Sequence, residues 1–372
     1  MTGIRLSFVY SMEDEFGKGK PDSNAWIAPP PGARFRCTMA RQATRVQSTG
    51  TKHWDTYAYG AFQGSWDMSF MLDYNYLEPL YFVFEDVDGD SIGGGRYSYT
   101  FTKADAKRVP SFCVRTVLLN EMAGGKDGED QINYLKGCVC KTMTISRSAG
   151  SSQFQVTMSG FYADESMEKG SLGKTDYQPY AGNLVEYSCL YTGGNGATGL
   201  DDCSYVANTE ALTIAIDNAA DAIYNVCCPF PTQYSEGVTT YTFSATSYRN
   251  APSNWEQRVY SGGFDNTRLS PMCKGMRPLD KAFILSYDKD CTDGSTPKSA
   301  YKDSDKSFAI DITKAVIRSI ERPNGDGSKL VDNMSSVDCQ LMGLKFVTDV
   351  STFDFTNTNK HAVTGSRLAT FS

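Results

Sequence analysis

The strongest constraint on the fold is a two-residue alternation of apolar and polar side chains. In the segment GSWDMSFML, the apolar residues Trp66, Met68, Phe70 and Leu72 alternate with small polar residues. The same alternation recurs in KTMTIS, QFQVTMSG and TTYTFSAT. Because successive side chains of a β-strand point to opposite faces, this period predicts half-buried strands. We therefore expect a mainly β protein.

The polar faces of these strands carry small uncharged side chains where lysine and glutamate are more usual. The residues concerned are Thr142, Thr144, Gln153, Gln155, Thr157, Ser159, Thr240, Thr242 and Ser244. A functional hypothesis has to explain why a water-facing surface would avoid charge.

Helical periodicity is rare. It is clearest in DYNYLEPLYFVFE, directly after the strand that ends at Leu72, where Pro79 suits a first helical turn. The stripe spaced at i, i+3, i+4 and i+7 consists of Leu77, Leu80, Tyr81 and Phe84. A weaker candidate spans residues 250–260. We predict a short helix at each place.

Residues 84–96, FEDVDGDSIGGGR, match two chemical motifs loosely. Ser91 fits the G-x-S-x-G pattern of a hydrolase, but that motif needs a strand before the serine and a helix after it. Counted from Asp86 as a calcium loop, the segment lacks the required glycine at its sixth position and glutamate at its twelfth. We interpret the segment as a turn that connects a helix to a strand, with no catalytic residue and no metal ion.

The charge and the cysteine content argue against several classes of function. The net charge is −7 and the pI is about 5.1, whereas a protein that grips nucleic acid normally shows a basic footprint. The eleven cysteines have only His53 and His361 as imidazole partners, so we predict free, mostly buried thiols and no zinc site. No apolar run has the length of a membrane helix, and no export signal is recognisable. We expect synthesis in a cytoplasm, no cofactor and no membrane.

The order of elements suggests an internal duplication. Gly60, a strand and a short helix recur as Gly237, a strand and a helix. We predict five parts, namely an N-terminal arm (1–33), a first domain (34–165), a linker (166–204), a second domain (205–350) and a C-terminal arm (351–372). Both arms have the polar composition of segments that become ordered only in an assembly.

This organisation resembles the tail tube proteins of long-tailed phages and archaeal tailed viruses. The stretches that carry the resemblance are YGAFQGSWDMSFMLDYNYLEPLYFVF (59–84), VPSFCVRTVLL with the following residues to Tyr162, and YVANTEALTIAID onward to Tyr248. The resemblance implies two tandem tail-tube-like β-sandwich or barrel domains, each with a short flanking α-helix.

The resemblance also implies an assembly. Two-domain subunits of this family form trimeric rings with pseudo-sixfold symmetry, with a hexameric ring as the alternative, and the rings stack into a tube. The nine uncharged residues named above, from Thr142 to Ser244, would face the lumen and let viral DNA pass without specific binding. The loops 41–59 and 218–236 would reach between rings. The protein would act in the virion tail, beside other tail proteins, after assembly in the host cytoplasm.

Two other functions remain open. One is another virion β-sandwich, such as a distal tail, terminator or decoration protein. The other is a carbohydrate- or surface-binding β-sandwich, in which Trp54, Trp66 and some of the 22 tyrosines would form sugar platforms. An enzyme is not expected, because no acid, base and nucleophile converge in the sequence.

Overall fold

The computed structural model describes most of the chain. The described residues are 4–5, 7–20, 26–30, 32–46, 56–73, 76–84, 86–93, 96–103, 108–119, 130–148, 151, 153–170, 174–175, 184–185, 188–193, 196–206, 209–248, 279–287, 306–321 and 334–350. The second predicted helix (250–260) and the C-terminal arm (351–372) lie outside them.

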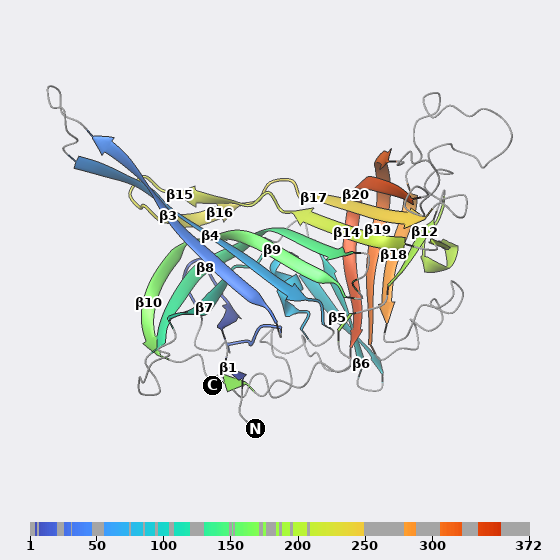
Figure 1. Ribbon diagram of the computed structural model, residues 1–372, viewed down its shortest axis with the longest axis horizontal. Helices are drawn as coiled ribbons and strands as arrows, with labels where there is room; N and C mark the ends of the chain where they lie inside the picture. Colours follow the sequence, from blue (N-terminus) through green and yellow to red (C-terminus); the bar gives the residue numbers. More distant parts are fainter. Residues whose placement is uncertain are drawn as a thin grey trace.

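The fold is mainly β, as the alternation predicts (Figure 1). The strands of the first half are β1 Ile4–Arg5, β2 Phe8–Met12, β3 Arg34–Val46, β4 Thr56–Met71, β5 Asp86–Gly93, β6 Arg96–Thr102, β7 Phe112–Leu119, β8 Asp130–Arg147, β9 Gln155–Tyr162, β10 Asp164–Gly170 and β11 Lys174–Thr175. Those of the second half are β12 Cys189–Gly193, β13 Ser204–Val206, β14 Thr209–Asp217, β15 Asp221–Tyr224, β16 Pro231–Ser235, β17 Thr240–Tyr248, β18 Leu279–Tyr287, β19 Lys306–Glu321 and β20 Met334–Val350. Two short 3₁₀ helices, η1 Glu78–Phe82 and η2 Leu200–Asp202, complete the described elements.

Sixteen of these strands form one antiparallel sheet. Its main path runs β13-β12-β18-β19-β20-β17-β14-β8-β9-β4-β3, and β2, β5, β6, β7 and β10 branch from it. We call the stretch from β4 to β17 the broad sheet; Figure 1 shows it crossing the middle of the molecule.

The two halves of the sequence meet inside the broad sheet. Strand β8 of the first half pairs with β14 of the second, in a register that runs from Arg147 opposite Leu212 to Thr142 opposite Asp217. The predicted domains 34–165 and 205–350 therefore contribute neighbouring strands to one hydrogen-bonded sheet. The predicted linker contains β12, which also belongs to this sheet.

One face of the broad sheet is apolar and buried. One row of residues that lie opposite one another on successive strands crosses the broad sheet and continues onto β20. It consists of Phe70, Val156, Ile145, Ile214, Phe243 and Cys339. Every member is at most 3% exposed. Beneath β4, aromatic rings from β2 and β7 complete the core; Trp66, for example, meets Phe112 edge to face at 5.2 Å. The result is a sandwich-like packing of two β layers.

Strand β8 takes part in both layers. Its N-terminal half pairs with β7 and β10, and its C-terminal half pairs with β9 and β14. The change occurs near Gly137, whose φ of +66° lies in the left-handed region that favours glycine. A Cβ atom at this position would lie 2.7 Å from the Cβ of Ala163.

A buried carboxylate fixes the chain beside this bend. Glu13 accepts backbone N–H groups from Gly17 (3.1 Å), Gly19 (2.9 Å) and Gly137 (3.0 Å). Burial raises the pKa of Glu13 above its ordinary value of 4.5, and these donors and the Ser111 side chain offset part of that effect. The carboxylate thereby ties the segment after β2 to the middle of β8.

Several predictions about local structure need correction. The segment expected to be an α-helix contains one five-residue 3₁₀ helix, η1, whose backbone bonds join residues three apart, from Leu80 N–H to Leu77 and from Val83 N–H to Leu80. The predicted stripe, Leu77, Leu80, Tyr81 and Phe84, is nevertheless buried. Asp86–Gly93 forms strand β5 and pairs with β6, although a turn was predicted there.

The N-terminal segment and the loop 41–59 also differ from expectation. Residues 8–12 are completely buried as β2, and residues 26–30 are buried too, so the prediction of an arm that orders only in an assembly is wrong for them. Residues 41–46 and 56–59 extend β3 and β4 into a two-stranded ribbon that projects from the body, although a loop was predicted (Figure 1).

The shared sheet makes β14 sensitive to substitution on one face only. We expect Ile214→Ala to lower the free energy of unfolding by about 2–5 kcal/mol, because it leaves a cavity beneath β8 and β17. The neighbouring substitution Thr213→Ala changes the opposite face and should cost no more than about 0.5 kcal/mol. Urea denaturation of both variants measures the difference; equal losses would contradict the assignment of the two faces.

The raised pKa of Glu13 predicts a specific pH dependence. Its folded-state pKa exceeds the unfolded one, so its contribution to stability is complete below pH 4.5 and is lost as the pH rises through the folded-state pKa. Glu13→Gln cannot titrate and should not show this loss. Urea denaturation of both proteins from pH 4 to about 8 tests this; parallel stability curves would refute it.

Candidate functional site: the polar face of the broad sheet

The face of the broad sheet opposite the core is lined by small polar side chains in register. One row crosses β4, β9, β8, β14 and β17 and consists of Ser69, Thr157, Thr144, Ala215 and Thr242. A second row, on the same strands, consists of Met71, Gln155, Ser146, Thr213 and Ser244. We call this surface the polar face.

The polar face is accessible to water within the single chain. Gln155 and Thr157 are exposed, and Thr142, Thr144 and Ser159 are half-buried. The hydroxyls of Thr142 and Ser159 form a hydrogen bond of 2.7 Å between β8 and β9. Hydroxyl groups can both donate and accept, so this surface is easily hydrated without carrying charge.

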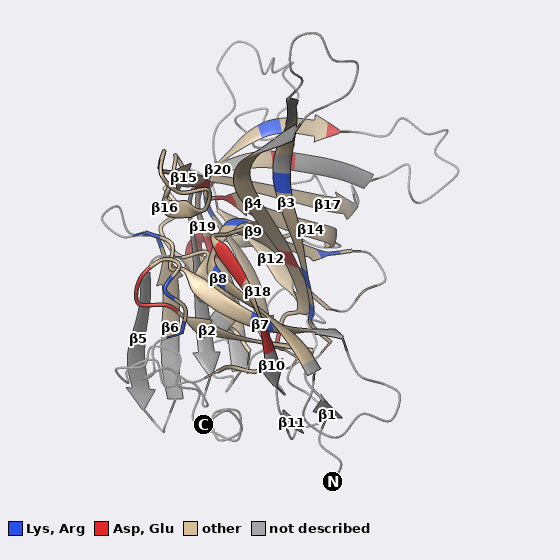
Figure 2. Ribbon diagram, turned by 90° about the vertical axis from the view of Figure 1, so that its left-hand side faces the viewer, with Lys and Arg blue, Asp and Glu red and all other residues tan. Residues whose placement is uncertain are grey.

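Charged residues lie at the margins of the polar face. A third row runs from Arg36 on β3 through Asp67, Ser159 and Thr142 to Asp217 on β14. Two of the four arginines of the neighbouring β3, Arg34 and Arg36, lie at this margin and are exposed. In Figure 2, basic and acidic positions are interspersed along the coloured strands.

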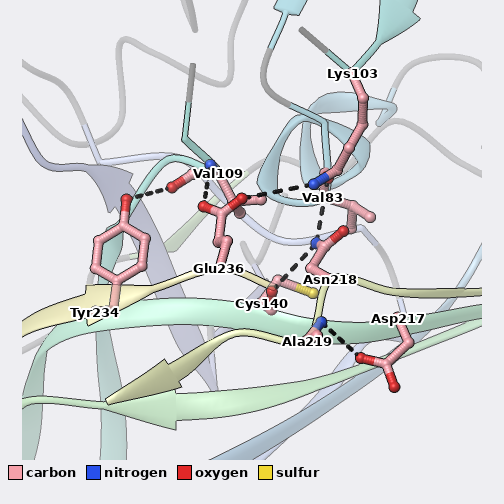
Figure 3. A network of polar contacts seen from close by, with 9 residues as sticks. All are labelled: Val83, Lys103, Val109, Cys140, Asp217, Asn218, Ala219, Tyr234 and Glu236. Carbon is pink, nitrogen blue, oxygen red and sulfur yellow. Dashed lines mark hydrogen bonds and ion pairs between the residues drawn. The ribbon is translucent and has the colours of Figure 1, made fainter. Parts of the chain in front are cut away.

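One end of the polar face is closed by the chain that follows β14 (Figure 3). The side-chain amide of Asn218 donates to the carbonyls of Val83 (3.3 Å) and Cys140 (3.4 Å). The next residue, Ala219, has a φ of +48°, and its N–H donates to Asp217 Oδ1 at 2.8 Å. This turn directs the chain back over the sheet, where Ala220 and Tyr234 cover Val139.

The segment after the turn is held by polar contacts to the first half of the chain. The Tyr234 hydroxyl donates to the carbonyl of Val109 at 2.6 Å, and the Val109 N–H donates to Glu236 Oε1 at 2.6 Å. Glu236 also forms an ion pair with Lys103 at 3.6 Å (Figure 3). Residues 218–236, predicted to be a loop, are therefore anchored, and they contain the hairpin β15–β16.

That hairpin lies against the base of the β3–β4 ribbon. The Phe62 N–H donates to the carbonyl of Pro229 at 2.8 Å, and the Tyr224 hydroxyl donates to the carbonyl of Phe62 at 2.7 Å. The rings of Phe62 and Phe230 are 5.2 Å apart. Of the two segments that were predicted to reach between rings, 218–236 therefore contacts β4 at Phe62, just beyond the end of 41–59.

Eight of the nine candidate residues from the sequence lie on β8, β9 and β17, and their strands are adjacent to β14 or to one another. Gln153 lies two residues before β9 begins. Sequence reasoning missed the contribution of β14, whose Thr213 and Ala215 lie between the rows of β8 and β17. The alternation of Leu212, Ile214 and Ile216 in TEALTIAID was the signal for it.

The other motifs do not gather at this face. Ser91 lies inside β5, and His53, His361 and Trp54 lie outside the described residues. Trp66 is 2% exposed and donates its indole N–H to the carbonyl of Phe161 at 3.0 Å, so it belongs to the core.

The cysteines are mainly structural. Burial raises the pKa of Cys113 and of Cys339 to about 12, which keeps these thiols protonated. Eight described cysteines are free, as predicted, but Cys189 is disulfide-bonded, which corrects the expectation for that residue.

Within the described ranges, no group of three or more His, Cys, Asp or Glu residues is placed to hold a metal ion. Of the helices in those ranges, none has the length and apolar character needed to span a bilayer.

No protein-family model matches this chain, and a search of curated proteins finds none that matches it.

The hydrogen bond between Thr142 and Ser159 should be measurable. We expect Thr142→Val and Ser159→Ala to be coupled by about 0.5–1.5 kcal/mol in a double-mutant cycle, because each removes one partner of the same bond. Thr144→Val serves as the control on the same strand and should show no coupling to Ser159→Ala. Additive effects in the first pair would show that the bond does not form.

Proposed function

We propose that this chain is a tail tube subunit, a structural virion protein whose copies assemble into stacked rings around a channel for DNA. The observation that carries the proposal is the polar face, which runs without interruption through strands from both halves of the chain. In this function, the broad sheets of neighbouring copies together line the lumen, and the apolar face remains packed in each subunit.

The chemistry of the polar face suits a channel for a polyanion. Non-specific binding to DNA comes mainly from lysine and arginine side chains that displace counterions from phosphates. The central rows offer hydroxyl, amide and methyl groups only. A surface of this kind stays hydrated and offers the phosphates no cationic side chain, so DNA passes without being retained.

The β3–β4 ribbon and the β15–β16 hairpin suit contacts between rings. The ribbon projects from the body, and the hairpin lies against its base. Both expose large apolar side chains, which usually mark interaction sites. These are Met39, Tyr59, Ile223, Tyr224, Val226 and Phe230, with Val226 fully exposed. Repetition of such a contact along one direction builds a tube, because a heterologous interface can continue without closing.

The number of copies in a ring follows from the tandem organisation. If residues 34–165 and 205–350 each act as one tail-tube-like unit, three copies supply six units, and a trimeric ring with pseudo-sixfold symmetry results. Electron microscopy of the purified chain tests the proposal directly. Rings or hollow rods are expected; monomers at every concentration, with binding in a glycan array, would favour a surface-binding module and refute a tube subunit.

The neutrality of the polar face gives a functional prediction. We expect Thr144→Arg/Thr157→Arg to assemble normally but to retain duplex DNA in a salt-dependent manner, because the introduced charges release counterions from the phosphates. Wild-type assemblies should not retain it. Fluorescence anisotropy with labelled DNA measures retention, and Ser204→Arg, an exposed site on β13, is the control. Equal DNA retention by all three proteins would show that Thr144 and Thr157 do not line the lumen.

A further inference from the structure

Two of the strands that pair with one neighbour only, β3 and β5, have an outer edge without a partner among the described residues. Strand β3 ends the main path and pairs with β4 only. Strand β5 ends the branch that leaves β20 through β6, and it pairs with β6 only. An unpaired edge presents backbone N–H and C=O groups that can bind another strand.

The two edge strands carry opposite charges. Strand β3 contains four arginines, at positions 34, 36, 41 and 45, and no acidic residue. Strand β5 contains three aspartates, at positions 86, 88 and 90, and no basic residue. In each strand some of these charges stand at alternate positions, so a single antiparallel or parallel register brings several of them opposite one another.

These charges select one kind of pairing. Two β3 edges would bring arginines together and two β5 edges would bring aspartates together, and like charges directly opposite each other are destabilising. Of the three pairings that these two edges allow, only β3 against β5 avoids both conflicts. That pairing is heterologous, so each copy uses one edge to bind the copy before it and the other to bind the copy after it.

We propose that β3 of one copy pairs with β5 of the next copy, so that the sheets of successive copies become continuous. This pairing rests on the proposed function, because it supposes head-to-tail assembly of the chain. The lengths agree: the regular part of β3, from Arg34 to the register shift after Arg41, is as long as the eight-residue β5.

The pairing also accounts for the position of two exposed arginines. Arg34 and Arg36 lie opposite Ser69 and Asp67 in register, at the margin of the polar face. Asp67 lies opposite Arg36, whereas Arg34 lies opposite the uncharged Ser69 and has no acidic residue across from it on β4. Aspartates from the next copy compensate this charge at the seam between copies.

An opposing explanation is that the charges only protect each edge from aggregation, as charged residues on edge strands often do. The two explanations predict opposite effects of charge reversal. Protective charges work equally well with either sign, whereas a β3–β5 contact requires opposite signs on the two strands.

The test compares assembly of the full chain and four variants by mass photometry and negative-stain electron microscopy. Arg34→Glu/Arg36→Glu makes both edges acidic, and Asp88→Lys/Asp90→Lys makes both basic. We expect each to need a protein concentration at least about tenfold higher for half-assembly than the wild type. The combined fourfold variant restores opposite signs and should assemble as the wild type does. Lys18→Glu, an exposed change away from both edges, is the control.

The outcomes separate the two proposals. Loss of assembly in both reversed variants with recovery in the fourfold variant supports the edge pairing, and the recovery excludes misfolding as the cause. Assembly of all variants at the wild-type concentration overturns the pairing but leaves the tube proposal intact. Failure of the fourfold variant to recover also overturns the pairing. A wild-type chain that never assembles overturns both.

Discussion

The fold depends on the antiparallel register between β8 and β14. This pairing joins strands that are distant in the sequence, and it places Ile145 opposite Ile214 on the apolar face and Thr144 opposite Ala215 on the polar face. Because side chains alternate along a strand, a slip of one residue would turn Ile214 toward water and Thr213 into the core. The burial of the apolar row therefore fixes the register, and the register in turn aligns the polar residues of both halves on one surface.

The faces of individual strands could be predicted because alternation is a local signal. Trp66, Met68 and Phe70 are all buried, and Gln155 and Thr157 are exposed, as their positions within the alternation indicate. Most of the candidate polar residues were identified in the same way. The period reveals which side chains share a face, but it contains no information about which strands become neighbours, so the place of β14 between β8 and β17 emerged only from the structure.

The wrong predictions about local structure have identifiable physical causes. The apolar stripe from Leu77 to Phe84 is buried as its spacing indicates, but that spacing does not distinguish a short α-helix from the five-residue 3₁₀ helix found there. Residues 41–46 (RQATRV) and 56–59 (TYAY) lack a clear alternation of large apolar and polar residues in the sequence; backbone pairing between the two strands nevertheless forms a ribbon. Glu13 offered no sequence signal either, since its role requires Gly137, far along the chain, to supply an N–H.

The sharing of β8 between two layers has a consequence for how the chain is made. The N-terminal half of β8 pairs with β7 on one side and β10 on the other, and its C-terminal half pairs with β9. All three partners lie within residues 112–170. The last open edge, residues 142–147, cannot close until residues 212–217 have left the ribosome. While residues 171–211 are synthesised, the nascent chain thus carries a sheet in which this edge of β8 has no partner strand.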